Sequence, residues 1–240
     1  NSEDSLCDNL PLQQKARDAM TEVLIKIIEQ LEEDIVFGRR RPRERLVEED
    51  LVTQFNAKKH IIRQALNDLE RMGLVKKIRN KGAMVRDYSP KDVRQIFSIR
   101  ELLEAEAARH IPLPVDPNFL DALEDVFAKH DEAVDHGDLH QAFRTNIKFH
   151  QVLFSACGNP YLVEAIEKLA LKAHAIRFYS LADPTLLHKA RDDHRRMIDA
   201  IRSGDREALI EVCIEHLQPA KHAYISAHEK FIRPPLLNAE

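Results

Sequence analysis

The chain has 240 residues, of which 44% are hydrophobic and 32% charged, so it can bury a core and wholesale disorder is excluded. Only six residues are glycine, which disfavours an all-β chain and favours long helices joined by short loops. No apolar run approaches the roughly 18 residues of a membrane helix. The acidic N-terminal segment is not of the secretory type, and three scattered cysteines are typical of a reducing compartment, so we expect a cytoplasmic protein.

The formal net charge of −4 is distributed unevenly along the chain. Residues 38–86 contain fourteen Lys and Arg but only six Asp and Glu, a net +8, whereas the remainder carries −12. A basic segment beside an acidic one indicates a polyanion-binding domain joined to a domain with another task. A charged surface that is merely solvated is the alternative interpretation.

The first domain is predicted to span residues 1–88. Apolar spacing, helix-ending glycines and an Asn/Gly turn between two β-rich runs define its elements. In chain order we predict helices over 13–36, 48–55 and 58–72 and strands over 74–78 and 83–86. This order is that of a winged helix-turn-helix with a small β-hairpin as the wing.

The second domain, residues 89–240, follows a break at residues 87–90 and is predicted to be an all-α helical bundle. Its six predicted helices span residues 91–110, 117–136, 138–157, 159–180, 184–203 and 205–230. The predicted fold class is therefore mainly α, with the only strands in the first domain. Every helix of the second domain carries an apolar stripe, which could serve a core or an interface.

The third helix of the first domain has one polar face. Its residues are Lys58, Lys59, His60, Arg63, Gln64 and Asn67. In a DNA major groove, Arg and Lys donate to guanine, and Asn and Gln pair with adenine. Cations in the first turn oppose the helix dipole by about 0.3–1 kcal/mol each, and no Ser, Thr or Asp caps this end. Local rules broken in this way often mark a functional site, because bound phosphates would offset the unfavourable field.

At these residues the chain resembles the GntR family of bacterial transcription regulators. The resemblance runs through Arg45-Leu-Val-Glu48, Phe55-Asn-Ala-Lys-Lys-His-Ile-Ile-Arg63 and Asn80-Lys-Gly82. It implies DNA binding, with Lys81 and Gly82 of the wing entering the neighbouring minor groove. The family usually has Gly-Val-Ser-Arg-Thr where this chain has residues 56–60, so the operator sequence is expected to differ.

The second domain resembles the FCD ligand-sensing domain of one GntR subfamily, and six helices place it nearer the VanR-like branch. In that subfamily an Asp-x-x-x-His pair and two later histidines hold a divalent metal. By position these residues are Asn146, His150, His194 and His216. Three imidazoles suit zinc or nickel, with manganese also open. Asn146 in place of the family's Asp implies weaker metal affinity or greater reliance on an anionic effector.

Arg100 is a candidate effector ligand. It lies beside Phe97 on an apolar helix face, a buried guanidinium needs an acceptor, and Arg binds carboxylates bidentately. An ion pair with Glu104, four residues later, is the structural alternative. Three further candidates, by helix placement alone, are His174, Arg177 and Tyr179.

These features predict a homodimeric transcriptional regulator, interpreted as a repressor and not as an enzyme. It is expected to bind a two-fold operator in double-stranded DNA, to sense a small organic acid over a divalent metal, and to have no membrane partner. Two alternatives stay open. The helical domain could serve dimerisation alone, or it could be a metal-dependent enzyme of the three-His type, although no HExxH or nucleophile motif occurs.

Overall fold

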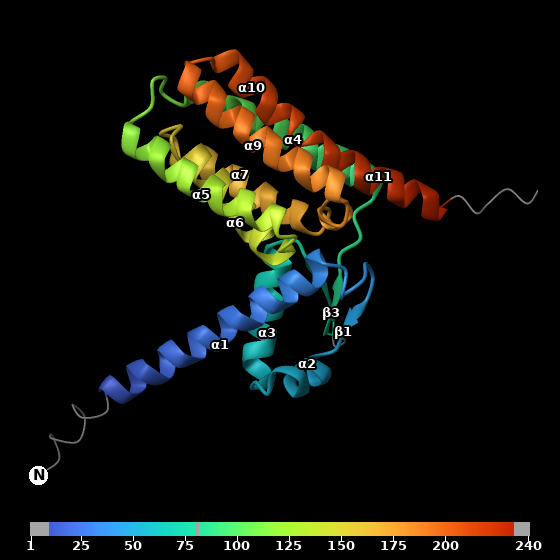
Figure 1. Ribbon diagram of the computed structural model, residues 1–240. Helices are drawn as coiled ribbons and strands as arrows, with labels where there is room; N and C mark the ends of the chain where they lie inside the picture. Colours follow the sequence, from blue (N-terminus) through green and yellow to red (C-terminus); the bar gives the residue numbers. More distant parts are fainter. Residues whose placement is uncertain (1–9, 80–81, 233–240) are drawn as a thin grey trace, which may run out of the picture. The chain divides into compact units, whose positions relative to one another are not determined.

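The computed structural model describes residues 10–79 and 82–232, which divide into two compact units (Figure 1). The N-terminal unit ends at Asp87 and the C-terminal unit begins at Tyr88. No helix within the described ranges combines the length and apolarity needed to cross a bilayer.

The N-terminal unit contains three helices and a small sheet. Their bounds are α1 Leu10–Val36, β1 Arg45–Leu46, α2 Glu48–Phe55, α3 Lys59–Arg71, β2 Val75–Ile78 and β3 Gly82–Val85. Helix α3 packs against both α1 and α2. Its apolar side chains Ile62, Ala65, Leu66 and Leu69 are all buried, as their spacing predicted. Asn56, which ends α2, adopts the left-handed conformation with φ +46°, which Asn tolerates better than most residues.

The sheet has three antiparallel strands in the order β1-β3-β2. The predicted hairpin is present as β2 and β3, and Val75 pairs with Val85. Strand β1 was not predicted, because two residues are too few to show an alternating pattern. Gly82 has φ +82°, and a Cβ built on it would collide with the carbonyl oxygen of Leu46 in β1. The close approach of β1 to β3 therefore requires glycine at this position.

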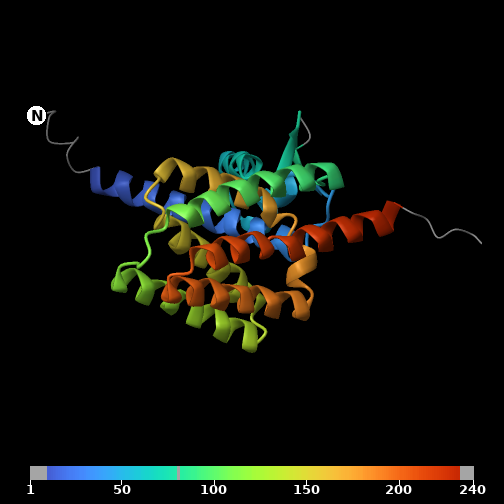
Figure 2. The ribbon, with the colours of Figure 1, turned by 90° about the horizontal axis from the view of Figure 1, so that it is seen from above.

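The C-terminal unit is all-helical. Its helices are α4 Pro90–His110, α5 Pro117–Asp135, α6 Leu139–Ser155, α7 Pro160–His174, α8 Phe178–Leu181, α9 Pro184–Ser203, α10 Arg206–Glu215 and α11 Gln218–Ile232. Six of them form a closed ring in which each contacts the next, in the order α4, α7, α6, α5, α9 and α10 (Figures 1 and 2). Helix α11 packs against α4 and α8.

Strong local signals start the helices of this ring. A Ser, Asp or Asn side chain accepts a hydrogen bond from the first turn of α4, α5, α6, α7, α9 and α10. At α4 the bond is reciprocal, because Asp92 also accepts from the backbone of Ser89. Four of these helices also have proline in the first turn, where its missing N–H costs nothing.

The six-helix expectation is corrected at two points. The helix predicted over 159–180 ends at His174, and the chain turns before the single-turn helix α8. The helix predicted over 205–230 is divided at His216 and Leu217, because Pro219 has no N–H for a continuing helix and fits the first turn of a new one. The described part of this unit thus has eight helical segments. The helix count therefore no longer favours the VanR-like branch.

Candidate functional site

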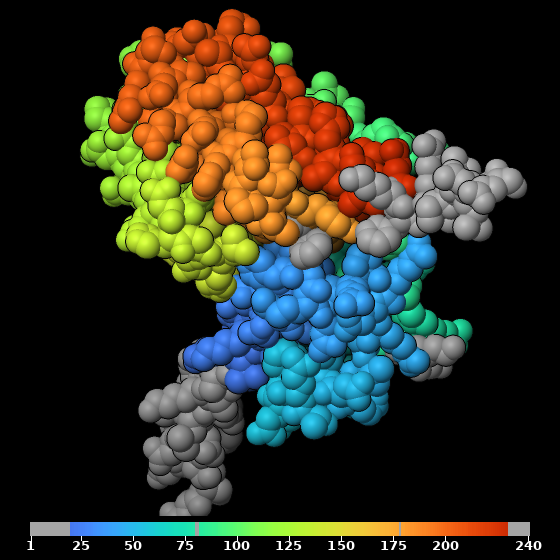
Figure 3. All heavy atoms as spheres, turned by 45° about the vertical axis from the view of Figure 1, so that its right-hand side comes forward, coloured from blue at the N-terminus to red at the C-terminus, as the bar shows by residue number. Residues whose placement is uncertain are grey.

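Helix α3 lies at the surface of the N-terminal unit (Figure 3, cyan), and its exposed side chains form one polar face. The side chains that the sequence predicted for this face are all exposed: Lys58, Lys59, His60, Arg63, Gln64 and Asn67. Lys58 is the N-cap residue, and no side chain caps this end of the helix. The predicted conflict between basic residues and the positive end of the helix dipole is therefore present.

Neighbouring elements hold three of these side chains. Glu48, in the first turn of α2, accepts from Arg63 Nε at 2.8 Å, and Glu49 accepts from Lys59 Nζ at 2.7 Å. Asn67 Oδ1 accepts from Nζ of Lys77 in β2 at 2.6 Å. Within the described residues, the two Nη groups of Arg63 make no hydrogen bond, so they remain available to a base or phosphate. These contacts within the N-terminal unit position side chains of the polar face of α3 and neutralise only part of its positive charge.

The wing residues have different outcomes. Lys81 lies outside the described residues. Gly82 begins β3, where the contact with Leu46 explains its identity by packing, so a role at DNA rests on the family resemblance alone.

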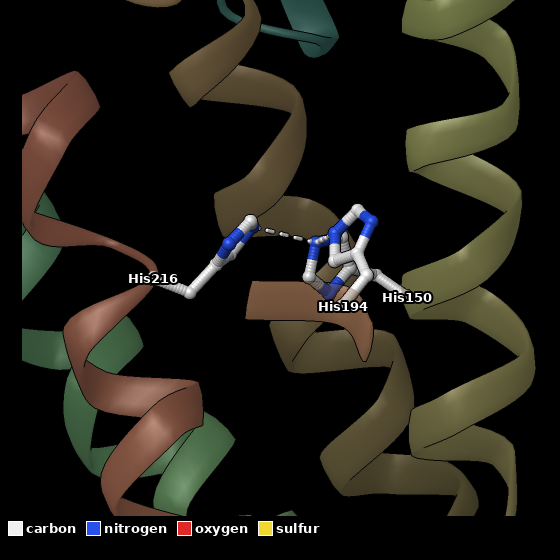
Figure 4. Close-up of side chains that lie close together, drawn as sticks. All are labelled: His150, His194 and His216. Carbon is white, nitrogen blue, oxygen red and sulfur yellow. Dashed lines mark hydrogen bonds between the residues drawn. The ribbon is translucent and has the colours of Figure 1, made fainter. Parts of the chain in front are cut away.

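Three histidines meet inside the C-terminal unit. His150 lies on α6, His194 on α9, and His216 is the C-cap residue of α10. His150 Nε2 lies 3.0 Å from His216 Nε2 and 3.3 Å from His194 Nε2 (Figure 4). One ligand atom from each of the three lies within 4.8 Å of the other two. The fold thus brings together three positions that are far apart in the sequence.

This arrangement fits a metal ion better than a hydrogen-bonded cluster. Burial holds the pKa values of His150 and His194 well below 6.5 and also lowers the pKa of His216, so all three rings are neutral at pH 7. Neutral imidazoles have one N–H each and cannot all satisfy one another through converging Nε2 atoms. Nitrogens around a tetrahedral zinc ion, each about 2.0–2.1 Å from it, stand about 3.3–3.4 Å apart. The residues present therefore fit a divalent metal.

Asp193 lies next to His216, on the side of the ring that faces away from the cluster. Its side chain is fully buried, and Oδ2 lies 3.8 Å from His216 Nδ1. Burial alone would raise the pKa of Asp193, but its interactions with His216 and Lys189 lower it, so it is a carboxylate. A carboxylate behind a ligand imidazole favours the tautomer with a proton on Nδ1 and a lone pair on Nε2.

Two cavities lie beside the cluster, with volumes of about 60 and 140 Å³, and Arg100 and Arg177 border both. Arg100 is 3% exposed and donates to Glu104 Oε1 from Nε at 2.9 Å and Nη2 at 2.8 Å. Its predicted alternative, the structural ion pair, is therefore present. The guanidinium of Arg177 makes no hydrogen bond or ion pair with any described residue. Burial and repulsion from Arg100, opposed by Glu104, lower the pKa of Arg177 to about 9.

The smaller cavity also contains Asn146 and a histidine that sequence reasoning missed, His130 of α5. His130 is 1% exposed, and its ring centroid lies 4.9 Å from that of His194. Burial lowers its pKa to about 4, so it is neutral. The available signal was its position in an apolar stripe with Leu123 and Val134, a pattern more often produced by a core histidine without ligand contacts.

Comparison with family models matches two segments of the chain. Residues 25–85 match the model described as bacterial regulatory proteins, gntR family, and residues 95–219 match the FCD domain. The second match alone covers more than half of the chain.

Individual relatives agree with these matches. The chain is 26% identical over 200 residues to the uncharacterized HTH-type transcriptional regulator YdhC of Bacillus subtilis, covering 83% of this chain and 89% of that protein. It is 25% identical over 191 residues to the HTH-type transcriptional repressor RspR of Escherichia coli, covering 78% and 82%. Among solved structures, Escherichia coli McbR/YncC aligns with a TM-score of 0.73 and 20% identity, covering 86% of this chain and 98% of that one.

Proposed function

Because the chain belongs to the GntR family of bacterial regulatory proteins and carries its FCD domain, we propose that it is a homodimeric repressor controlled by a small organic acid. The coarser function, a DNA-binding transcriptional regulator, is that of the family and its relatives. Repression is supported by relatives that are named repressors, including RspR and a probable D-xylose utilization operon repressor of Paenarthrobacter nicotinovorans.

One observation carries the effector proposal: the unpaired guanidinium of Arg177 beside the three converging imidazoles. An isolated buried cation is costly, and an anion that enters the cavity would remove this cost. Arg100 already donates to Glu104, so we assign the carboxylate of the effector to Arg177. Arg100 borders the same cavities, and its ion pair with Glu104 offsets the charge of that carboxylate, which lines the larger cavity.

The metal is the second part of the proposal. His150, His194 and His216 would hold it, and the amide oxygen of Asn146, one helical turn before His150, would complete the set. Zinc or nickel suits three imidazoles, and manganese is a further option. When bound, the ion supplies a Lewis acid that accepts an oxygen of the effector. An amide in place of a carboxylate leaves the site with a higher positive charge, which strengthens its attraction for an organic acid.

The DNA-binding part is assigned to the polar face of α3. In the proposed dimer, two copies of this face read the halves of a two-fold operator, because the symmetry of protein and DNA must match. The acid can change operator affinity only by binding one arrangement of the dimer more tightly than another.

The first experiment is elemental analysis of untagged protein by plasma mass spectrometry, normalised per chain. We expect about one equivalent of divalent metal. Calorimetric titration with small carboxylates and operator binding at increasing salt follow. Acid binding and a steep loss of operator affinity with salt are expected. A C-terminal unit that binds neither metal nor any acid would leave dimerisation as its role, and turnover of an acid would revive the enzyme alternative.

A further inference from the structure

An acidic residue contacts the polar face of α3. Glu48 belongs to the first turn of α2, a helix that packs against α3 (Figure 1). Its Oε2 accepts the hydrogen bond from Arg63 Nε at 2.8 Å. The side chain of Glu48 is 18% exposed and that of Arg63 is 58% exposed, so the carboxylate is shielded while much of the guanidinium is open to solvent. A face that would bind an anion therefore has a negative charge beside one of its cations.

This contact leaves the outer edge of the guanidinium open. Nε is the nitrogen nearest the aliphatic stem, and the two Nη groups form the far edge of the planar fork. A hydrogen bond to Nε restricts rotation of the plane without using either Nη group. The two Nη groups can donate together to O6 and N7 of guanine. Glu48 therefore orders Arg63 in a form that can still make an end-on contact with a base.

The next residue provides an internal comparison. Glu49 Oε1 accepts from Lys59 Nζ at 2.7 Å, whereas Glu48 Oε2 lies 3.9 Å from the same nitrogen. The Glu49 side chain is 69% exposed. Both acids lie in the first turn of α2, where the helix dipole stabilises a carboxylate. They carry the same charge at nearly the same place, but Glu48 alone of the two holds Arg63.

A carboxylate at this position affects DNA binding in two ways. It orders a flexible side chain before binding, which lowers the entropy lost when that side chain contacts a base. It also repels the phosphates of every DNA sequence. The first effect favours only sequences that offer the matching base, and the second disfavours all sequences. Together they raise the ratio of operator affinity to random-DNA affinity, which decides where a regulator binds among many competing sites.

We propose that Glu48 is a positioning residue that determines operator discrimination. It directs the Nη groups of Arg63 toward a base and weakens binding to random DNA. This inference rests on the proposed function, in which the polar face of α3 reads the operator. It deepens that function by assigning part of the specificity to a side chain of the preceding helix.

The test compares two labelled duplexes of equal length with the full-length protein. One is selected by the parent protein from a random library, and the other is a scrambled version of it. Fluorescence anisotropy measures both affinities. Glu48→Ala should bind the scrambled duplex a few-fold more tightly and lower the ratio of the two affinities by about tenfold. Glu49→Ala, the control with the same change of charge, should raise both affinities by one factor and leave the ratio unchanged.

Two further proteins separate positioning from charge and from folding. Glu48→Asp keeps an acid in the first turn of α2, but its side chain is one methylene too short for the bond to Arg63 Nε. It should fold normally, bind scrambled DNA as the parent does and lose most of the discrimination. In an Arg63→Ala background, Glu48→Ala should no longer change the ratio, because Glu48 acts through Arg63. Thermal unfolding checks each variant, and Glu48→Asp carries the test if Glu48→Ala does not fold.

The possible results separate this inference from the proposed function. If Glu48→Ala and Glu49→Ala change both affinities alike, Glu48 acts through its charge alone and the inference is overturned, while reading of the operator by α3 stands. If Glu48→Ala still lowers the ratio in the Arg63→Ala background, Glu48 does not act through Arg63 and the inference fails. If Arg63→Ala by itself leaves the ratio unchanged, the assignment of the operator to this face of α3 fails together with the inference.

Discussion

The two units of this protein treat their helix starts in opposite ways. In the C-terminal unit, a polar side chain caps each helix of the ring, from Ser89 at α4 to Asp205 at α10. In the N-terminal unit, α2 begins after Val47 and α3 after Lys58, neither of which makes a capping hydrogen bond. The caps of the six ring helices stabilise the walls around the cavities of this unit. Helix α3 starts without a side-chain cap and with basic residues in its first turn, an arrangement that an anion such as a DNA phosphate would complete.

Unsatisfied groups occur in the C-terminal unit too, but in its interior. The Nδ1 atoms of His150, His194 and His216, together with His130 Nε2 and Asn146 Nδ2, are buried without partners in the described structure. Each such atom costs about 1–3 kcal/mol of stability. The capped helix starts satisfy their local hydrogen-bonding needs. The unsatisfied buried atoms are concentrated where a metal and an effector would bind.

The largest expected effect is on the metal. Replacing His150 and His194 together by Ala should reduce the bound metal from about one equivalent per chain to none, because one imidazole and an amide remain. The metal-free fold should persist, because the Nδ1 atoms of His150 and His194 make no hydrogen bond to the described residues and none is lost on substitution. His110→Ala, at an exposed histidine of α4, is the matched control. Retention of metal by the double variant, with His110→Ala unchanged, would place the site elsewhere.

Acid should destabilise the metal-free protein next most strongly. Burial lowers the pKa of His130 to about 4 and lowers those of His150 and His194 well below 6.5. The unfolded chain therefore binds more protons below pH 6.5, and the free energy of unfolding falls as the pH drops through this range. Each histidine contributes up to about 1.4 kcal/mol per pH unit between its unfolded and folded pKa values.

Urea denaturation of chelator-treated protein between about pH 7.5 and pH 5 measures this loss. His130→Asn should reduce the slope, because one depressed histidine is removed. A flat profile would mean that these rings are not buried in their neutral form.

A third effect concerns the open face of α3. Arg63→Ala should cost about 1–3 kcal/mol of specific operator binding, because the variant loses the Nη groups left free by the bond to Glu48. Fluorescence anisotropy with a labelled operator measures this change. Arg94→Ala, at an exposed position of α4, is the control and should leave operator affinity unchanged. Equal loss on operator and random DNA would show a phosphate contact instead of base recognition.

The smallest effect compares the two kinds of helix start directly. Asp138 accepts from Gln141 N at 2.9 Å, and Asp138→Ala should lower the free energy of unfolding by about 1 kcal/mol. Lys58→Asp supplies the missing cap of α3 and should raise that free energy by about the same amount while weakening DNA binding. Thermal unfolding and anisotropy on both variants check the pair. A Lys58→Asp protein that binds DNA as well as the parent would remove the functional explanation for the uncapped end.

The sequence predicted best where local chemistry decides the structure. Helix α2 has the predicted bounds, and α3 begins and ends within one residue of them. Gly38 and Gly73, which were predicted to end helices, both have positive φ values. The division of α7 from α8 was not predictable in this way, because no Gly or Pro lies at residues 175–177 and only packing breaks the helix. That same turn carries Arg177, which helix placement alone had suggested as a further effector candidate.

The three metal-ligand candidates and His130 differ in the same way: the first could be predicted from the sequence, and the second could not. Family resemblance placed His150, His194 and His216 by position, and the fold brings them together. His130 has no motif, and which of its ring nitrogens carries the proton cannot be seen in the sequence. That depends in turn on a carbonyl and a hydroxyl of α6, twelve and fifteen residues later. Contacts of this kind between two helices leave no trace in a one-dimensional pattern.

The pair formed by Tyr88 and Tyr224 joins the first residue of the C-terminal unit to the middle of α11. The hydroxyl of Tyr224 on α11 accepts from the backbone N–H of Tyr88 and donates to the carbonyl of the same residue, both at 3.1 Å. The first turn of α11 supplies Pro219 and Ala220 to the wall of the smaller cavity. Helix α11 therefore contributes both to the wall of the smaller cavity and to the hydrogen bonds that hold the first residue of the C-terminal unit. The backbone N–H and the carbonyl oxygen of Tyr88 are thus both held by one side chain of α11, six residues after the start of that helix.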